Sequence, residues 1–288
     1  MKGAGWEEIG LETREIDGVR VEVPKPDLGG RVIPYAWNSV WGWGGEERAY
    51  KLANAGYEVV LANAPNLYFD LAAEKHPKDP GFAWAGFVDE RKAFEMTPMD
   101  IYNSAYEDLF GHPIDPETYR DAARLTPEGA ENILGIQGQL WGENTPSEAR
   151  FEYHLYPKML ALAERAWAEQ PAWETIENRE ERVQLLDADW NRFANSLGRR
   201  ELGRLARMYG GVGYRMPPPG GVIVDDMLYA NVAFPGLEVR FTTDGSEPTA
   251  ASPLWRAPVR VDATVKVRAF DAAGRGGRPV MLERTGIQ

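Results

Sequence analysis

The stretch of sequence that decides the fold runs from Gly135 to Ala168 and reads GIQGQLWGENTPSEARFEYHLYPKMLALAERAWA. The apolar run over 131–141 predicts a buried strand that ends at Trp141, and the carboxylate of Glu143 follows directly. Pro146 and Ser147 then predict the start of a helix that continues to about Ala168. A strand, a polar site at its carboxyl end and a covering helix are typical of parallel sheets.

Two earlier segments repeat this order of strand and helix. Strands are predicted over 31–37 and 57–64, and a helix over 44–56 stands between them. An aromatic residue or a carboxylate stands at or soon after the end of each strand, namely Trp37, Tyr68 and Asp70. Residues 71–130 predict loops and short helices. The pattern favours a parallel sheet with covering helices, and in a (β/α)8 barrel, which is one such architecture, active sites lie at the carboxyl ends of the strands.

The pattern changes after a Pro- and Gly-rich linker over 210–221. Runs such as LEVRFTTDG and TVKVRAF alternate apolar and polar residues with a period of two, which predicts antiparallel strands. We therefore predict two domains, an α/β domain over 1–212 and a small all-β, immunoglobulin-like sandwich over 213–288.

Composition narrows the classes of function. The net charge of −12 disfavours a nucleic-acid partner, and no apolar run is long enough to predict a membrane span. There is no cysteine, so disulfides, thiolate metal sites and a cysteine nucleophile are excluded. The three scattered histidines favour neither a metal site nor a Ser-His-Asp triad, and we expect no metal and no cofactor. Ten Trp and twelve Tyr, several beside carboxylates, suit the apolar faces and hydroxyls of sugars.

Five segments resemble the C-terminal half of the family-20 glycoside hydrolases, the bacterial β-N-acetylhexosaminidase and chitobiase group. They are GWEEI (5–9), AWNSVWGWGG (36–45), GYEVVLANAPNLYFD (56–70), GIQGQLWGE (135–143) with YPKMLALAERAW (156–167), and GLEVRFTTDGSEPT (236–249). The first four resemble strands 5–8 of the family's TIM barrel, including its Tyr-x-Asp and Trp-x-Glu signatures. The last resembles the family's C-terminal β-sandwich, so the resemblance covers nearly the whole chain.

The resemblance implies a retaining, substrate-assisted hydrolysis, in which the substrate's own acetamide oxygen attacks the anomeric carbon. Tyr68 would donate its hydroxyl to that oxygen, and Asp70 and Glu143 would accept hydrogen bonds from ring hydroxyls. The indoles expected to contact the substrate are those of Trp6, Trp37 and Trp141, as walls of the acetamide pocket, and Trp84, as a stacking platform for the next sugar. A catalytic dyad of Asp70 and Glu143 is the alternative that the residues alone leave open.

In the family, the catalytic Asp-Glu pair precedes the Gly-Trp motif, which stands here at residues 5–6. We therefore expect a fragment of a β-N-acetylhexosaminidase that lacks this pair and is inactive alone. The alternatives are a non-catalytic protein that binds N-acetyl sugars or acts as a scaffold, and a subunit completed by a partner chain. Half a barrel would leave open sheet edges, which favours self-association or pairing with the missing N-terminal half. The sequence leaves localisation open, and the family's habit favours the periplasm or secretion.

Overall fold

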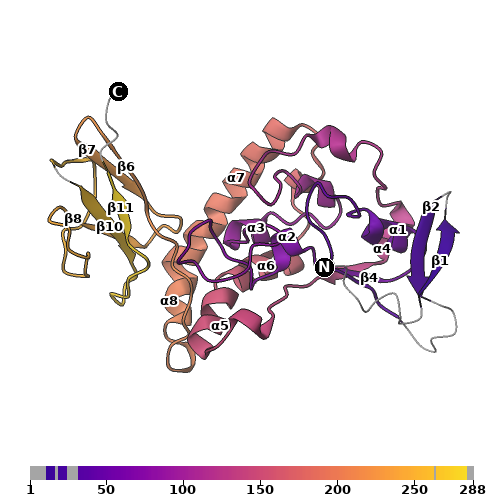
Figure 1. Ribbon diagram of the computed structural model, residues 1–288, viewed down its shortest axis with the longest axis horizontal. Helices are drawn as coiled ribbons and strands as arrows, with labels where there is room; N and C mark the ends of the chain where they lie inside the picture. The colour runs from indigo at the N-terminus through magenta and orange to yellow at the C-terminus, as the bar shows by residue number, and fades with distance from the viewer. Residues whose placement is uncertain (1–10, 17–18, 25–31, 263, 284–288) are drawn as a thin grey trace. The chain divides into compact units, whose positions relative to one another are not determined.

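The computed structural model describes residues 11–16, 19–24, 32–262 and 264–283 (Figure 1). The chain divides into two compact units. Unit 1 comprises residues 1–146 and 158–185, and unit 2 comprises residues 147–157 and 186–288. The predicted division into 1–212 and 213–288 stays a prediction.

Unit 1 contains a three-stranded parallel sheet in the order β3-β4-β5. Its strands are β3 (Tyr35–Ala36), β4 (Val59–Leu61) and β5 (Ile133–Ile136). They lie within the three predicted ranges but are shorter. The pairing continues past the strand ends, where Ala62 N–H donates to the Ala36 carbonyl at 3.0 Å and Gln137 N–H to the Leu61 carbonyl at 2.8 Å. The predicted fourth barrel strand, at Trp6, lies outside the described residues.

The other strands that the structure describes in unit 1 are β1 (Leu11–Ile16) and β2 (Val19–Pro24), which form an antiparallel hairpin. Its described helices are α1 (Arg48–Asn54), α2 (Ala64–Leu67), α3 (Glu90–Phe94), α4 (Pro127–Glu131) and α6 (Lys158–Trp167). Gly56, with φ of +90°, follows the end of α1 as the sequence predicts, because glycine adopts this left-handed backbone without strain.

The prediction of one continuous helix over 147–168 is wrong. The structure has α5 (Glu148–Leu155) and then α6, with Pro157 between them. Proline has no backbone N–H and its ring clashes with the preceding turn, so it ends a helix rather than continuing it. Consequently Lys158 begins a new helix.

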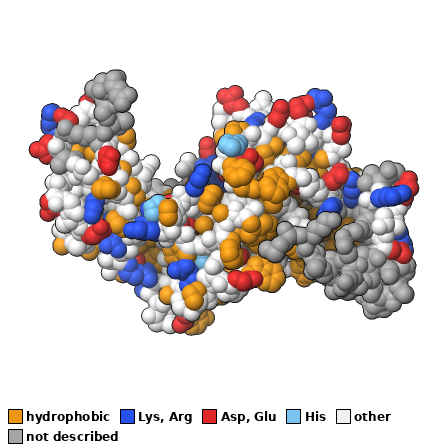
Figure 2. Space-filling view, viewed as in Figure 1, with side chains coloured by type: hydrophobic (Ala, Val, Ile, Leu, Met, Phe, Trp, Pro, Cys, Tyr) orange, Lys and Arg blue, Asp and Glu red, His pale blue; other side chains and the backbone are white. Residues whose placement is uncertain are grey.

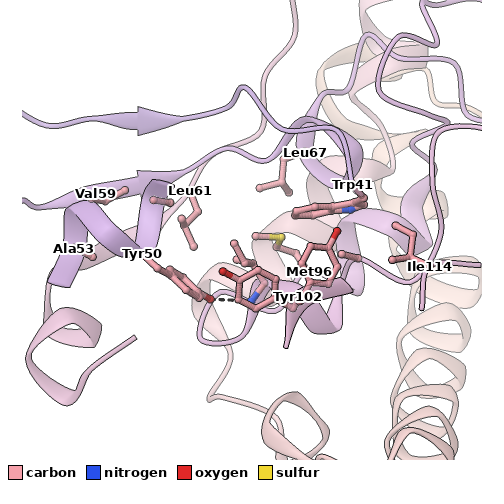
Figure 3. Close-up of a cluster of buried hydrophobic side chains, with 13 residues drawn as sticks. Trp41, Tyr50, Ala53, Val59, Leu61, Leu67, Met96, Tyr102 and Ile114 are labelled. Atoms are coloured by element: carbon pink, nitrogen blue, oxygen red, sulfur yellow. Dashed lines mark hydrogen bonds between the residues drawn. The ribbon is translucent and has the colours of Figure 1, made fainter. Parts of the chain in front are cut away.

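The core of unit 1 joins the sheet and α1 to the segment 71–130 (Figure 3). Tyr50 of α1 illustrates the join, because its hydroxyl donates to the Pro98 carbonyl and accepts from Ile101 N–H, both at 2.8 Å. Other buried members from the segment are Met96, Tyr102, Ile114 and Tyr119. The segment without a clear pattern in the sequence is therefore a packed part of the domain.

Unit 2 contains two three-stranded antiparallel sheets around one apolar core. One has the order β6-β7-β9 and the other β11-β10-β8. The strands are β6 (Gly220–Val224), β7 (Met227–Asn231), β8 (Glu238–Thr242), β9 (Val259–Arg260), β10 (Val265–Phe270) and β11 (Val280–Leu282). The predicted antiparallel strands are present, and the immunoglobulin-like character stays a prediction. The helices toward this end of the chain are α7 (Arg179–Ser196) and α8 (Leu202–Leu205).

Candidate functional site

Four of the predicted aromatic residues form one cluster with Tyr68 at its centre. The Tyr68 ring stacks on Trp37 with centroids 6.0 Å apart, meets Trp84 edge-on at 5.4 Å, and lies 6.4 Å from the tilted ring of Trp141. Trp37 and Trp84 also meet edge-on at 6.3 Å. Trp37 directly follows β3, and the other two strands lead to Tyr68 and Trp141. The parallel sheet thus gathers rings from distant parts of the sequence at one end.

Tyr68 is held by backbone pairing with the segment that follows β5. Phe69 N–H donates to the Gln139 carbonyl at 2.6 Å, and Gln139 N–H donates to the Leu67 carbonyl at 2.8 Å. The Tyr68 side chain is 3% exposed. Burial raises the pKa of Tyr68 to about 12, with a smaller contribution from the nearby Asp70 charge, while a hydrogen bond from the Trp141 side chain opposes the rise. The phenol therefore keeps its proton at neutral pH and remains a hydrogen-bond donor.

Asp70 is the buried carboxylate of the site, with 2% of its surface exposed. Burial raises its pKa above the ordinary value, and the nearby charge of Glu143 adds to the rise. The backbone N–H groups of Asp70 and Trp141 and the charge of Lys158 act in the opposite direction. Within the described part of the chain, Oδ1 of Asp70 has no hydrogen-bonding partner. Glu143 itself is exposed, in a short 3-10 turn over Gly142–Asn144.

Two of the rings are open to solvent: Trp84 is 40% and Trp141 is 49% exposed. Trp84 follows Phe82, whose backbone is bonded to the site, because Ala72 N–H donates to the Phe82 carbonyl at 2.7 Å. Figure 2 shows hydrophobic side chains gathered on the displayed face of unit 1. The last predicted site residue, Trp6, lies outside the described residues.

The sequence reasoning missed Lys158, which is 1% exposed. Its ammonium group donates to the carbonyls of Phe69 and Leu71, at 2.9 and 3.1 Å. Helix patterning assigns a lysine to the solvent side by default. The sequence did contain one sign that Lys158 is unusual. It directly follows Pro157, at the first turn of a helix, where a positive charge is unfavourable.

Open aromatic faces, a neutral phenol donor and carboxylate acceptors are the groups that a carbohydrate site requires. Among the residues that the structure describes, no cluster of three or more His, Asp and Glu side chains could hold a metal ion. In the same part of the chain, no helix combines the length and apolar character needed to cross a bilayer.

Comparison with known proteins identifies the class. Residues 2–170 match the model of the glycosyl hydrolase family 20 catalytic domain, and residues 201–279 match the chitobiase/β-hexosaminidase C-terminal domain. The chain therefore belongs to glycosyl hydrolase family 20, a family of glycoside hydrolases that comprises β-hexosaminidases, and the resemblance drawn from the motifs is confirmed. Membership assigns residues 2–170 to a domain of the TIM-barrel type, and a half-barrel stays a prediction.

Similar proteins include N,N'-diacetylchitobiase from Vibrio harveyi, 33% identical over 222 residues that span 73% of this chain and 24% of that protein. A β-hexosaminidase from Vibrio vulnificus is 32% identical over 273 residues, spanning 86% of this chain and 30% of that protein. Among solved structures, the family-20 exo-β-N-acetylglucosaminidase from Vibrio harveyi in complex with N-acetylglucosamine is 29% identical, over 55% of this chain and 21% of that chain, with a TM-score of 0.34. The chain thus spans less than a third of the length of these relatives.

Proposed function

We propose that unit 1 carries the substrate pocket of a β-N-acetylhexosaminidase and binds the terminal N-acetylglucosamine or N-acetylgalactosamine of a glycan. The observation that supports this most directly is the buried phenol of Tyr68 among three indole rings. An acetamide group has an apolar methyl and one strong acceptor oxygen. An aromatic enclosure that contains a neutral phenol donor matches both features.

Tyr68 is the donor to the acetamide oxygen in this proposal. In a retaining, substrate-assisted reaction this oxygen attacks the anomeric carbon, so its charge changes as the transition state forms. A donor fixed by burial and by the Phe69–Gln139 backbone bond needs no reorganisation at that moment. The indoles of Trp37 and Trp141, together with Trp6, wall the acetamide and exclude water.

Asp70 and Glu143 accept hydrogen bonds from the ring hydroxyls, and Trp84 stacks on the next sugar. Among the residues that the structure describes, none bonds Oδ1 of Asp70, which supports the first role because a buried acceptor without a partner gains most from a ligand hydroxyl. The 40% exposure of Trp84 leaves a ring surface available for stacking.

The general acid and the Asp that orients the acetamide are, on this proposal, supplied by polypeptide outside these 288 residues. The chain alone then binds but does not hydrolyse, and it pairs with that polypeptide or with a second copy. An assay with a chromogenic N-acetylglucosaminide should show no turnover by this chain alone. Turnover that is abolished by Glu143→Gln contradicts these role assignments.

The direct test is binding of N-acetylglucosamine, compared with glucose, measured by tryptophan fluorescence and calorimetry. We expect Tyr68→Phe to weaken N-acetylglucosamine binding about two- to tenfold, as one hydrogen bond is lost. The matched control is Tyr229→Phe, at a half-exposed tyrosine on β7 of unit 2, which should leave binding unchanged. No preference for N-acetylglucosamine over glucose, or equal affinity of Tyr68→Phe and the unaltered chain, contradicts the proposal. Preserved binding with no turnover, even when an N-terminal half is supplied, favours a binding protein instead.

A further inference from the structure

The ammonium group of Lys158 occupies an unfavourable position. Only 1% of the residue is exposed, and removing an ammonium from water costs several kcal/mol unless other groups solvate it. Lys158 is also the first residue of α6, where the helix dipole opposes a positive charge. Helix stability and apolar packing therefore both favour an uncharged residue here, and the contacts that the ammonium makes must account for it.

Those contacts lie on both sides of Asp70. The ammonium donates to the carbonyl of Phe69 at 2.9 Å and to that of Leu71 at 3.1 Å. Phe69 and Asp70 lie in a turn, across which Leu71 N–H donates to the Tyr68 carbonyl at 3.3 Å. An ammonium group has three N–H donors, so a single lysine can bond both carbonyls that flank Asp70. The carbonyl of Asp70 itself accepts from Phe82 N–H at 3.2 Å. Lys158 and Phe82 thus hold the three successive carbonyls around this carboxylate.

The same segment is also fixed at both ends. Phe69 N–H is bonded to Gln139, in the segment after β5, and Ala72 N–H is bonded to the Phe82 carbonyl. Gln139 and Phe82 hold this segment through their backbone, whereas Lys158 holds it with its side chain from helix α6. The charge of Lys158 also opposes the rise in the pKa of Asp70 that burial and the charge of Glu143 cause.

We propose that Lys158 is the positioning residue of the sugar site: by holding the carbonyls of Phe69 and Leu71, it sets the direction in which Asp70 accepts the hydroxyl hydrogen bonds of an N-acetylhexosamine ring. The proposal rests on the function proposed above. Lys158 does not touch the substrate and acts through Asp70. Removing the ammonium therefore affects binding only while Asp70 is present.

The test is a double-mutant cycle on the 288-residue chain, with Lys158→Met, Asp70→Asn and the combination, and with N-acetylglucosamine affinity as the readout. We expect Lys158→Met to weaken binding about tenfold in the unaltered chain and less than twofold in the Asp70→Asn background. Lys158→Arg keeps the charge and several donors and should restore most of the affinity. The matched control is Lys75→Met, at an exposed lysine five residues beyond Asp70, which should change nothing.

A purely structural role gives a different result. If Lys158→Met weakens binding equally with and without the Asp70 carboxylate, or does not weaken it at all, the proposal is overturned. If the methionine variant does not fold, Lys158→Gln replaces it, because the amide keeps two N–H donors without the charge. The pH midpoint below which binding fails should also move upward in Lys158→Met, since the positive charge that favours ionised Asp70 is gone.

A second readout needs no ligand and separates this proposal from the proposed function. Amide hydrogen exchange at Phe69 and Phe82 should become about tenfold faster in Lys158→Met, while amides of β4 remain unchanged. If the unaltered chain binds no N-acetylglucosamine, the proposed function fails, and exchange at these two amides still decides whether Lys158 holds the segment. Unchanged exchange there overturns the positioning role.

Discussion

Gly81 lies directly against the backbone that carries Asp70, and replacing it with alanine should disturb the site through the main chain alone. A Cβ at this position would lie 2.4 Å from the Ala72 nitrogen and 2.7 Å from the Asp70 carbonyl oxygen. Contacts under 3.0 Å are not tolerated, and backbone atoms, unlike a flexible side-chain end, cannot turn away. The φ of +130° at Gly81 is also unfavourable for alanine.

The size of the effect follows from the unfavourable φ at Gly81 and from the steric contact of the added Cβ. A left-handed backbone costs an alanine about 1 kcal/mol. Overpacking against a fixed neighbour costs a further ~1–3 kcal/mol. The total of about 2–4 kcal/mol should lower the unfolding midpoint of unit 1 by roughly 4–16 °C. Gly56→Ala is the matched control, because its φ is +90° and no atom lies within 4 Å of its Cβ position. It carries only the backbone term, roughly 2–4 °C.

Thermal and urea unfolding of the two variants, followed by tryptophan fluorescence, compare these values directly. N-acetylglucosamine affinity is then measured at a temperature where both variants are folded. We expect weaker binding in Gly81→Ala only, because the segment around Asp70 must shift to admit the methyl group. Equal unfolding midpoints for the two variants would show that the contact is relieved without cost, and the reasoning would be refuted.

Three further predictions concern buried groups away from that contact. Glu174 is 3% exposed and burial raises its pKa, so its ionisation lowers the stability of the fold as the pH rises above the ordinary glutamate pKa of 4.5. In urea unfolding, the free energy that Glu174→Gln gains over the unaltered chain should therefore increase from pH 4 to 8. A difference that stays constant with pH contradicts this. Leu228→Ala, at a fully buried residue of unit 2, should cost about 2–5 kcal/mol in unfolding free energy, whereas Val224→Ala, at a 48% exposed residue, should cost less than about 0.5 kcal/mol. Trp41→Phe should lower the unfolding free energy by about 2–4 kcal/mol, because it leaves a cavity and removes the indole hydrogen bond, and it should not change sugar affinity. Trp37→Phe should chiefly weaken sugar binding. If Trp41→Phe weakens binding and Trp37→Phe does not, the assignment of Trp37 to the site is wrong.

The positions of the three parallel strands could be predicted from the sequence because each appears as a short continuous apolar run. The prediction that all three are buried is wrong, since Tyr35 of β3 is 48% and Leu134 of β5 is 45% exposed, whereas Val59 and Leu61 of β4 are fully buried. The residues that follow such strands share one end of the sheet. This geometry suffices to bring Tyr68, Trp37 and Trp141 together without knowledge of the loops between them. The expected roles of these residues toward a substrate came from the family signatures, because several aromatic residues near a sheet edge do not by themselves identify a ligand.

In the loop after β3, the environment of each tryptophan could not be predicted from the sequence. It contains three tryptophans within seven residues, and the structure gives each a different environment. Trp37 is half-buried in the aromatic cluster, Trp41 is 1% exposed in the core with its indole N–H donating to Asn66 Oδ1 at 3.0 Å, and Trp43 is 67% exposed. A loop has no period that would assign its side chains to a face, so only tertiary packing distinguishes the three. Lys158 was missed for a related reason, since its partners are backbone carbonyls nearly ninety residues away.

Two unsatisfied polar atoms among the described residues agree with the ligand site that we propose at the end of β4. Buried acceptors are nearly always hydrogen-bonded, because each one left without a partner costs about 1–3 kcal/mol. Among the described residues, the two buried side-chain oxygens without a partner are Oδ1 of Asn63 and Oδ1 of Asp70, and each residue is 2% exposed. Both residues lie within ten positions of the end of β4, on the segment that carries Tyr68. A fold optimised only for stability would pair or remove these acceptors, whereas a binding site leaves them for donors that arrive with a ligand or another polypeptide.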